Sequence, residues 1–156
     1  IDVVNVKSAA DMAEAVAARS EASDRVVMCS AVADYTPTHY SAQKVKKSDG
    51  ELSIPLARTT DILHTLGMKK KEGQMLVGFS METENLIENS RKKLSKKNAD
   101  IICANTIADG GATGFAVDTN QVTLITETEV ITLPLCTKEE TADLILSHIV
   151  ELQKEK

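Results

Sequence analysis

The fold is decided by residues 75–105, MLVGFSMETENLIENSRKKLSKKNADIICAN. The two ends of this stretch, 75–80 and 99–105, are short runs that are apolar on both faces, which is typical of strands buried between two layers of helices. Between them, over 83–97, apolar residues recur at helical spacing and lysines crowd the last turns. A strand, a helix and a second strand in this order predict a right-handed crossover between parallel strands.

The same alternation continues on both sides of this unit. Residues 25–33, RVVMCSAVA, predict a central buried strand, and shorter strands are predicted at 2–6 and 51–56. The alternating segments 122–126 and 129–135 are separated by little more than two residues and predict an antiparallel hairpin. The fold class expected is therefore α/β: a Rossmann-like three-layer domain with a mostly parallel sheet and an antiparallel hairpin at its edge.

The helices carry start and stop signals of their own. They are predicted at 8–19, with Ser8 and Asp11 in capping-box spacing; at 61–66, with Thr59 or Thr60 as cap and Gly67 as terminator; at 83–97; and at 137–153, with Thr137 and Glu140 in capping-box spacing.

Composition narrows the classes of function. The chain has 156 residues, a net charge of −5 and no Trp, which disfavours a general nucleic-acid binder. No apolar run is long enough for a membrane span, and three scattered cysteines give neither a disulfide framework nor a zinc knuckle. We expect a single cytoplasmic domain over residues 1–156. Because the chain begins with Ile1, we also expect that something upstream is missing.

Candidate ligand residues lie where the predicted strands end, because open α/β sheets bind ligands beyond the carboxyl ends of their strands. Asp34 follows the strand at 25–33, and either a turn or a ligand contact explains it. Lys93 and Lys97 are four apart and share one helix face, where they either complement the helix dipole or hold an anion. The polar segment 34–50 predicts an exposed, flexible loop whose lysines, Lys44 among them, are ordinarily solvated. Neither GxxxxGK[ST] nor GxGxxG occurs.

The order of several short segments goes further. Ala31-Val32-Ala33-Asp34-Tyr35 is followed by Lys44-Val45-Lys46-Lys47, Thr60-Asp61-Ile62-Leu63, Gly78-Phe79-Ser80-Met81-Glu82-Thr83, KLSKKNADIICAN (93–105), and Gly114-Phe115 with Asp118 and Asn120. This series resembles the motifs of phosphopantothenoylcysteine synthetase (phosphopantothenate–cysteine ligase), the ligase module of the bacterial bifunctional flavoprotein of coenzyme A biosynthesis. The resemblance runs from Val6 to the last helix, and five ordered motifs, of which the first combines 31–35 and 44–47, make it specific.

The resemblance implies a two-step ligation. CTP activates the carboxylate of 4′-phosphopantothenate as an acyl-cytidylate, and the amine of L-cysteine then displaces CMP to form the amide. It implies Mg²⁺ on the phosphates, a homodimer, and, in many bacteria, an upstream fusion to a flavin-dependent decarboxylase. Backbone groups would read the base, so the residue types do not separate CTP from ATP.

The resemblance also implies roles for single residues. Lys44 corresponds to the catalytic lysine on an active-site flap at 34–50, with Lys46 and Lys47 as weaker candidates. The implied nucleotide-binding residues are Met28, Cys29, Ser30, Asp34, Lys44, Thr60, Asp61, Ile62, Leu63, Phe79, Lys93 and Lys97; Asp34 would meet ribose or cation, and no metal ligand is assigned beyond that.

One departure from the family pattern leaves two other interpretations open. The Gly-rich phosphate-binding segment and the Asn-containing loop that open the family module are not among residues 1–156. A noncatalytic nucleotide-binding α/β module therefore stays open as a second interpretation. A dehydrogenase-like or methyltransferase-like dinucleotide domain is a third, although its glycine fingerprint is missing.

Overall fold

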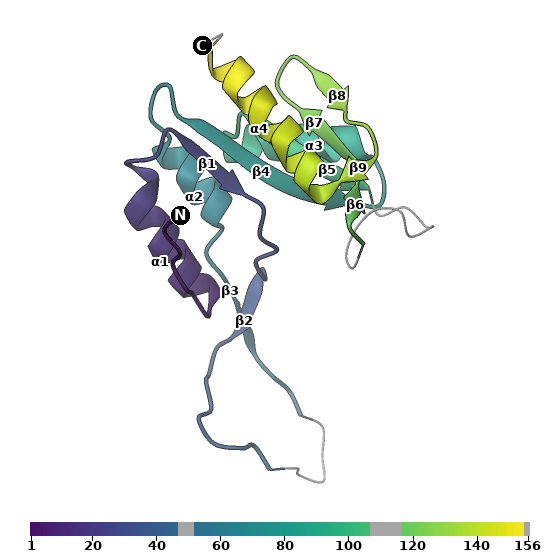
Figure 1. Ribbon diagram of the computed structural model, residues 1–156. Coiled ribbons are helices and arrows are strands. Elements are labelled where there is room, and N and C mark those ends of the chain that lie inside the picture. The colour runs from purple at the N-terminus through teal and green to yellow at the C-terminus, as the bar shows by residue number, and fades with distance from the viewer. Residues whose placement is uncertain (47–51, 107–116, 155–156) are drawn as a thin grey trace.

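A computed structural model describes residues 1–46, 52–106 and 117–154 (Figure 1). In chain order its elements are α1 (Ala9–Ser20), β1 (Arg25–Met28), β2 (Tyr35–Pro37), β3 (Leu56–Arg58), α2 (Ile62–Lys69), β4 (Met75–Glu82), α3 (Leu86–Lys97), β5 (Ile101–Thr106), β6 (Thr119–Asn120), β7 (Val122–Ile125), β8 (Val130–Thr132), β9 (Cys136–Thr137) and α4 (Lys138–Lys154).

The central sheet has five strands in the order β1-β4-β5-β7-β8. β1, β4 and β5 are parallel, β7 pairs antiparallel with β5, and β8 pairs antiparallel with β7. Because two reversals restore the original direction, all strands of this sheet except β7 run the same way. The mostly parallel sheet and the antiparallel edge hairpin are confirmed.

Helices cover both faces of the sheet, as Figure 1 shows. Along β4, Met75 and Val77 point to one face and pack with Ile145 and Ile149 of α4. Leu76 points to the other face and packs with α2. Successive side chains along a strand point to opposite faces of the sheet. Because helices cover both faces here, the β4 segment has to be apolar at successive positions. The predicted three-layer α/β domain is confirmed.

Two helix starts form as predicted. Ser8 Oγ accepts a hydrogen bond from the Asp11 N–H at 3.1 Å, and the Asp11 carboxylate accepts one from the Ser8 N–H at 3.0 Å. The hydrogen bonds to Ser8 and the neighbouring backbone hold the pKa of Asp11 below its ordinary value. At α4, the Thr137 hydroxyl and the Glu140 carboxylate make the same reciprocal pair.

Several local predictions are wrong. Residues 2–6 form no strand, and Val3 and Val4 are exposed, because no described strand pairs with this segment. The strand predicted at 25–33 ends at Met28, and it is an edge strand because β4 is its only partner among the described residues. One face of this edge is open, which leaves Val27 exposed.

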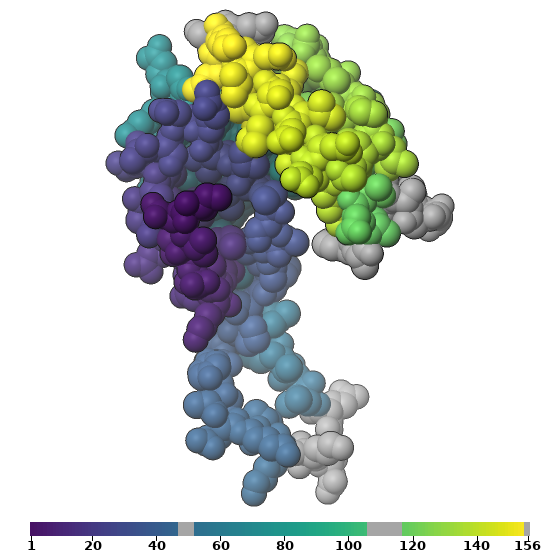
Figure 2. Space-filling model, in the orientation of Figure 1, coloured from purple at the N-terminus to yellow at the C-terminus, as the bar shows by residue number. Residues whose placement is uncertain are grey.

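The segment predicted as a loop over 34–50 begins as a strand. β2 pairs antiparallel with β3, so the two form a ribbon at the base of the excursion between them. The strand predicted at 51–56 is displaced to β3. Residues 38–46 and 52–55 have no helix or strand and reach away from the body of the molecule (Figure 2), whereas 47–51 lie outside the described residues.

The predicted N-cap and the predicted end of α2 are also wrong. Asp61, rather than Thr59 or Thr60, caps this helix, and Gly67 lies inside it instead of ending it. Among the helices of the described segments, none has both the length and the apolar character needed to span a membrane.

Candidate functional site

Two adjoining cavities open at the carboxyl ends of β1, β4 and β5. The smaller has a volume of about 190 Å³ and the larger about 660 Å³. They share a wall made of Ser30, Val32, Asp34, Phe79 and Lys93. Together they have the size of ordinary small-molecule sites, about 300–1,000 Å³, and lie where the topology of an open α/β sheet predicts a ligand.

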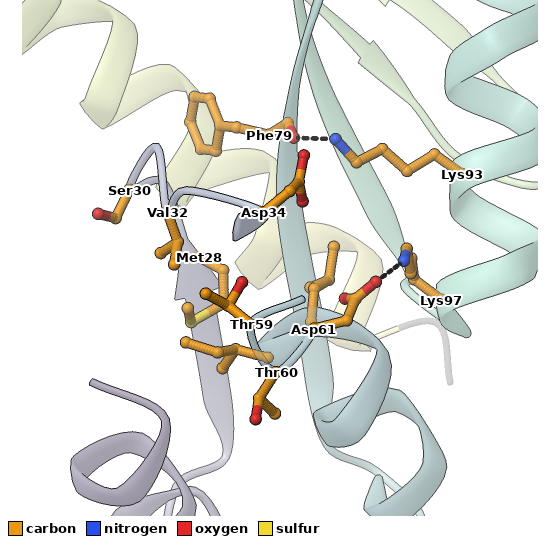
Figure 3. Close-up of a pocket in the computed structure, with 12 residues that line it drawn as sticks. Met28, Ser30, Val32, Asp34, Thr59, Thr60, Asp61, Phe79, Lys93 and Lys97 are labelled. Atoms are coloured by element: carbon orange, nitrogen blue, oxygen red, sulfur yellow. Dashed lines mark hydrogen bonds and ion pairs between the residues drawn. The ribbon is translucent and has the colours of Figure 1, made fainter. Parts of the chain in front are cut away.

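Both candidate lysines of α3 reach the smaller cavity (Figure 3). Lys93 Nζ donates a hydrogen bond to the Phe79 carbonyl oxygen at 2.9 Å, at the end of β4. Lys97 Nζ forms an ion pair with the Asp61 carboxylate, and only 13% of the Lys97 side chain is exposed. Their spacing of four residues places both ammonium groups on one helix face, as predicted.

Asp61 serves two partners through its two oxygens. Oδ1 accepts the His64 N–H at 3.0 Å and so caps α2, while Oδ2 pairs with Lys97. Partial burial by itself raises the pKa of this carboxyl. The hydrogen bonds from Lys97 and His64 and the charge of Lys97 outweigh that effect, so the pKa lies below its ordinary value.

The ion pair depends on a close approach of α2 to the end of α3. Gly67 makes this possible, because a Cβ at that position would lie 1.8 Å from the Lys97 carbonyl oxygen. Asn98 Nδ2 donates to the Gly67 carbonyl at 2.9 Å, and the His64 ring lies 3.1 Å from the Lys96 carbonyl oxygen through Nδ1. These contacts fix Lys97 relative to the start of α2.

The segment after β1 is tied to the segment before α2. The Thr59 N–H donates to the Asp34 carbonyl at 2.9 Å, and the Thr59 hydroxyl donates to the Ala33 carbonyl at 2.6 Å. Figure 3 shows the Asp34 carboxylate lying in the cavity between the Lys93 and Lys97 contacts. The cavity therefore presents two cations and two carboxylates.

The larger cavity extends over the α4 side of the sheet. Asn120 Nδ2 donates to Asn105 Oδ1 at 3.3 Å at its edge. Lys138 and Thr141 come from the first turns of α4, and Ile145 adds an apolar surface. Its walls thus offer amide and hydroxyl hydrogen-bonding groups, one further cation and an apolar side.

All predicted nucleotide-binding residues except Cys29 and Lys44 line the smaller cavity. Cys29 lines the larger one, and it is exposed, although its place in the apolar run 25–33 favours a buried thiol. Burial, with a smaller contribution from Cys29, raises the pKa of the Cys103 thiol to about 12, which disfavours the reactive thiolate at neutral pH. Lys44 lies on the exposed excursion and lines neither cavity.

Some of the predicted motif residues lie outside the described residues: Lys47 with the last part of the flap, and Gly114-Phe115. The lining residues to which the sequence assigned no ligand role include Val32, Thr59, Lys138 and Thr141. Val32 could have been found from the sequence, because ligands of open α/β sheets bind beyond the carboxyl ends of the strands. The other three come from segments whose approach to the strand ends is set by tertiary packing, so no local signal marks them.

The donor set of the smaller cavity fits Mg²⁺ held mainly by a bound polyphosphate. Mg²⁺ prefers oxygen ligands and, at phosphate sites, takes only one or two carboxylates from the protein. Asp34 and Asp61 supply that number. The described residues contain no group of three or more His, Cys, Asp or Glu that could hold a metal without such a ligand.

Residues 1–152 match the family described as the DNA/pantothenate metabolism flavoprotein C-terminal domain. The chain belongs to this family. It is 45% identical over 155 residues to the coenzyme A biosynthesis bifunctional protein CoaBC of Bacillus subtilis (strain 168), covering 99% of this chain and 38% of that protein. The crystal structure of the C-terminal domain of a CoaBC protein superposes with a TM-score of 0.78 at 40% identity, covering 98% of this chain and 66% of that one.

A relative with a different name shares the same domain. A cysteine/cysteine sulfinic acid decarboxylase from an unknown prokaryotic organism is 42% identical over 153 residues, which cover 97% of this chain and 42% of that protein. Family membership therefore establishes the domain and its fold rather than the reaction. The chain spans well under half the length of either relative, so the activity of a whole protein is a separate question.

Proposed function

We propose that this chain is the ligase domain that joins 4′-phosphopantothenate to L-cysteine with CTP in coenzyme A biosynthesis. The observation that carries the proposal is the convergence of Lys93 and Lys97 with Asp34 and Asp61 around one cavity. Similarity to CoaBC of Bacillus subtilis supports the pathway, because that protein is named for coenzyme A biosynthesis.

The chemistry requires two steps. A carboxylate oxygen of 4′-phosphopantothenate attacks the α-phosphorus of CTP, and pyrophosphate leaves. The cysteine amine then attacks the acyl carbon, loses a proton, and CMP leaves as the amide forms. Because the first step brings a carboxylate up to a triphosphate, cations must offset the repulsion, and charge-assisted contacts contribute about 1.5–3 kcal/mol each.

The residues of the chain would divide this work by position. The Phe79 carbonyl occupies one of the three N–H donors of Lys93 and aims the ammonium into the cavity. Such preorganised charge needs little rearrangement when negative charge develops in the transition state. Asp34 and Asp61 would hold Mg²⁺ on the triphosphate, where the metal supplies further charge neutralisation.

The larger cavity would take the acid. Its amide pair, Asn105 and Asn120, and the hydroxyl of Thr141 suit a ligand with amide and hydroxyl groups, while Lys138 suits its phosphate. The shared wall brings the two ligands together next to Asp34 and Lys93. Lys44, as catalytic lysine, would have to approach from the exposed segment 38–46, because it lines neither cavity.

The test uses the full-length protein with CTP, 4′-phosphopantothenate and L-cysteine, and follows CMP and the amide product by mass spectrometry. We expect one CMP per amide. We expect Lys44→Gln to slow amide formation severely without unfolding, whereas Lys93→Ala and Lys97→Ala raise the CTP concentration required. CTP binding without any product would contradict the ligase and favour the noncatalytic nucleotide-binding module, and normal turnover by Lys44→Gln would remove that residue from the mechanism.

A further inference from the structure

The walls of the smaller cavity carry no net charge. Lys93 and Lys97 are matched by Asp34 and Asp61 among its described walls. A cavity of balanced charge does not by itself attract a bare polyphosphate, and carboxylates close to the phosphates repel it. The same carboxylates become favourable when the polyphosphate carries a divalent cation.

The two lysines are not equally available to a phosphate. Lys93 is held by a neutral carbonyl, that of Phe79, and keeps its remaining N–H donors for a ligand. Lys97 is largely enclosed and already has an anion, the Asp61 carboxylate, which is half exposed at the cavity. A phosphate that approaches Lys97 therefore meets a carboxylate oxygen in the position that it would occupy.

Asp61 can give up this ion pair without disturbing the helix that carries it. Its Oδ1 caps α2 through the His64 N–H, and its Oδ2 alone contacts Lys97. The start of α2 also favours a negative charge. Capping and ion pairing are thus separate contacts, and only the second faces the ligand.

We propose that Asp61 is a specificity-determining residue that makes this cavity select the metal complex of a polyphosphate over the bare polyphosphate. The Asp61 carboxylate competes with bare phosphate for the Lys97 ammonium. When a metal-bound polyphosphate enters, this carboxylate would exchange its contact with Lys97 for a contact with the divalent cation. The inference rests on the proposed function only in taking a polyphosphate as the ligand of this cavity, not in the choice of CTP or in the ligation.

The test compares the full-length protein with Asp61→Asn, because Asn caps helices as well as Asp and lacks the charge. Binding is measured by calorimetry with inorganic tripolyphosphate and with CTP, each in EDTA and in Mg²⁺. We expect the affinity of Asp61→Asn for either probe in EDTA to rise about tenfold, equivalent to about 1.4 kcal/mol. The gain in affinity on adding Mg²⁺ should fall by a similar factor.

A matched control makes the same carboxylate-to-amide change on α3, away from both cavities. Glu88 pairs with Lys92 at 2.7 Å with both side chains well exposed, and neither lines a cavity described above. Glu88→Gln should leave both affinities and the Mg²⁺ gain unchanged. Lys97→Gln provides a second arm that does not depend on the folding of Asp61→Asn: it should weaken binding in EDTA and enlarge the Mg²⁺ gain.

The outcomes separate the inference from the proposed function. An Mg²⁺ gain that is the same in the wild type and in Asp61→Asn, or weaker binding by Asp61→Asn in EDTA, overturns the inference while leaving a CTP-dependent ligase intact. Tripolyphosphate binding that follows the expected pattern, with no binding of CTP, supports the inference and contradicts the use of CTP. Failure of the wild type to bind either probe overturns both.

Discussion

Replacing Gly67 by Ala tests the packing that sets the position of Lys97. In an exposed helix interior this change is favourable by about 1 kcal/mol, because Ala is the better helix former. Here the added Cβ would lie 1.8 Å from the Lys97 carbonyl oxygen and 2.8 Å from its carbonyl carbon, both backbone atoms. Moving from 1.8 Å to even 3.0 Å requires α2 and α3 to separate.

The magnitude follows from what this separation disturbs. Overpacking of a tight contact costs about 1–3 kcal/mol. The hydrogen bond from Asn98 to the Gly67 carbonyl and the contact of His64 with the Lys96 carbonyl lengthen as well, at about 0.5–1.5 kcal/mol for each bond lost. After subtraction of the gain in helix propensity, we expect Gly67→Ala to lower the free energy of unfolding by about 2–4 kcal/mol.

Urea denaturation followed by circular dichroism measures this change. With a slope of about 1–3 kcal/mol/M for small proteins, the midpoint should fall by about 1 M or more. Asn98→Gly serves as control, because glycine accepts the left-handed backbone at Asn98 (φ 49°) and removes only the side-chain hydrogen bond; it should cost about 1 kcal/mol. A Gly67→Ala protein as stable as the wild type, or more stable, would refute the close approach of α2 to α3.

Three further predictions concern single side chains. Ser8→Ala removes the cap of α1 and should cost about 1 kcal/mol of unfolding free energy, measured by the same denaturation; no change would contradict the capping box. Native alkylation with iodoacetamide, read by mass spectrometry, should modify Cys29, which is exposed, and spare Cys103, whose burial raises its pKa to about 12; rapid modification of Cys103 would show that the sheet opens there. The lowered pKa of Asp61 stabilises the fold above the unfolded value of about 3.9 and is lost as the pH falls through the folded value. The stability difference between wild type and Asp61→Asn should therefore shrink below about pH 4, and a difference independent of pH would contradict the ion pair.

Much of the candidate site could be predicted because strand ends are visible in the sequence. Phe79 lies near the end of one apolar run, Asp34 directly follows another, and Lys93 and Lys97 share a helix face by their spacing alone. The resemblance of ordered motifs added Asp61 and its neighbours. The sequence could not place Lys138 and Thr141, because they reach the same strand ends only through the packing of α4 on the opposite face of the sheet.

The amino-acid sequence by itself determined the order of α1–α4 and of the five central-sheet strands, the capping at Ser8 and Thr137, and the buried character of β4 and β5. These properties depend on periodicity and on contacts between near neighbours, which any stretch of chain carries locally. Tertiary structure alone decided that β1 is an edge, that β2 and β3 form a ribbon, and that Asp61 meets Lys97, 36 residues away. These outcomes depend on which surfaces meet when the layers assemble. Hydrophobic burial drives that assembly, and because it is non-directional, an apolar pattern in the sequence does not specify which partner a surface will meet.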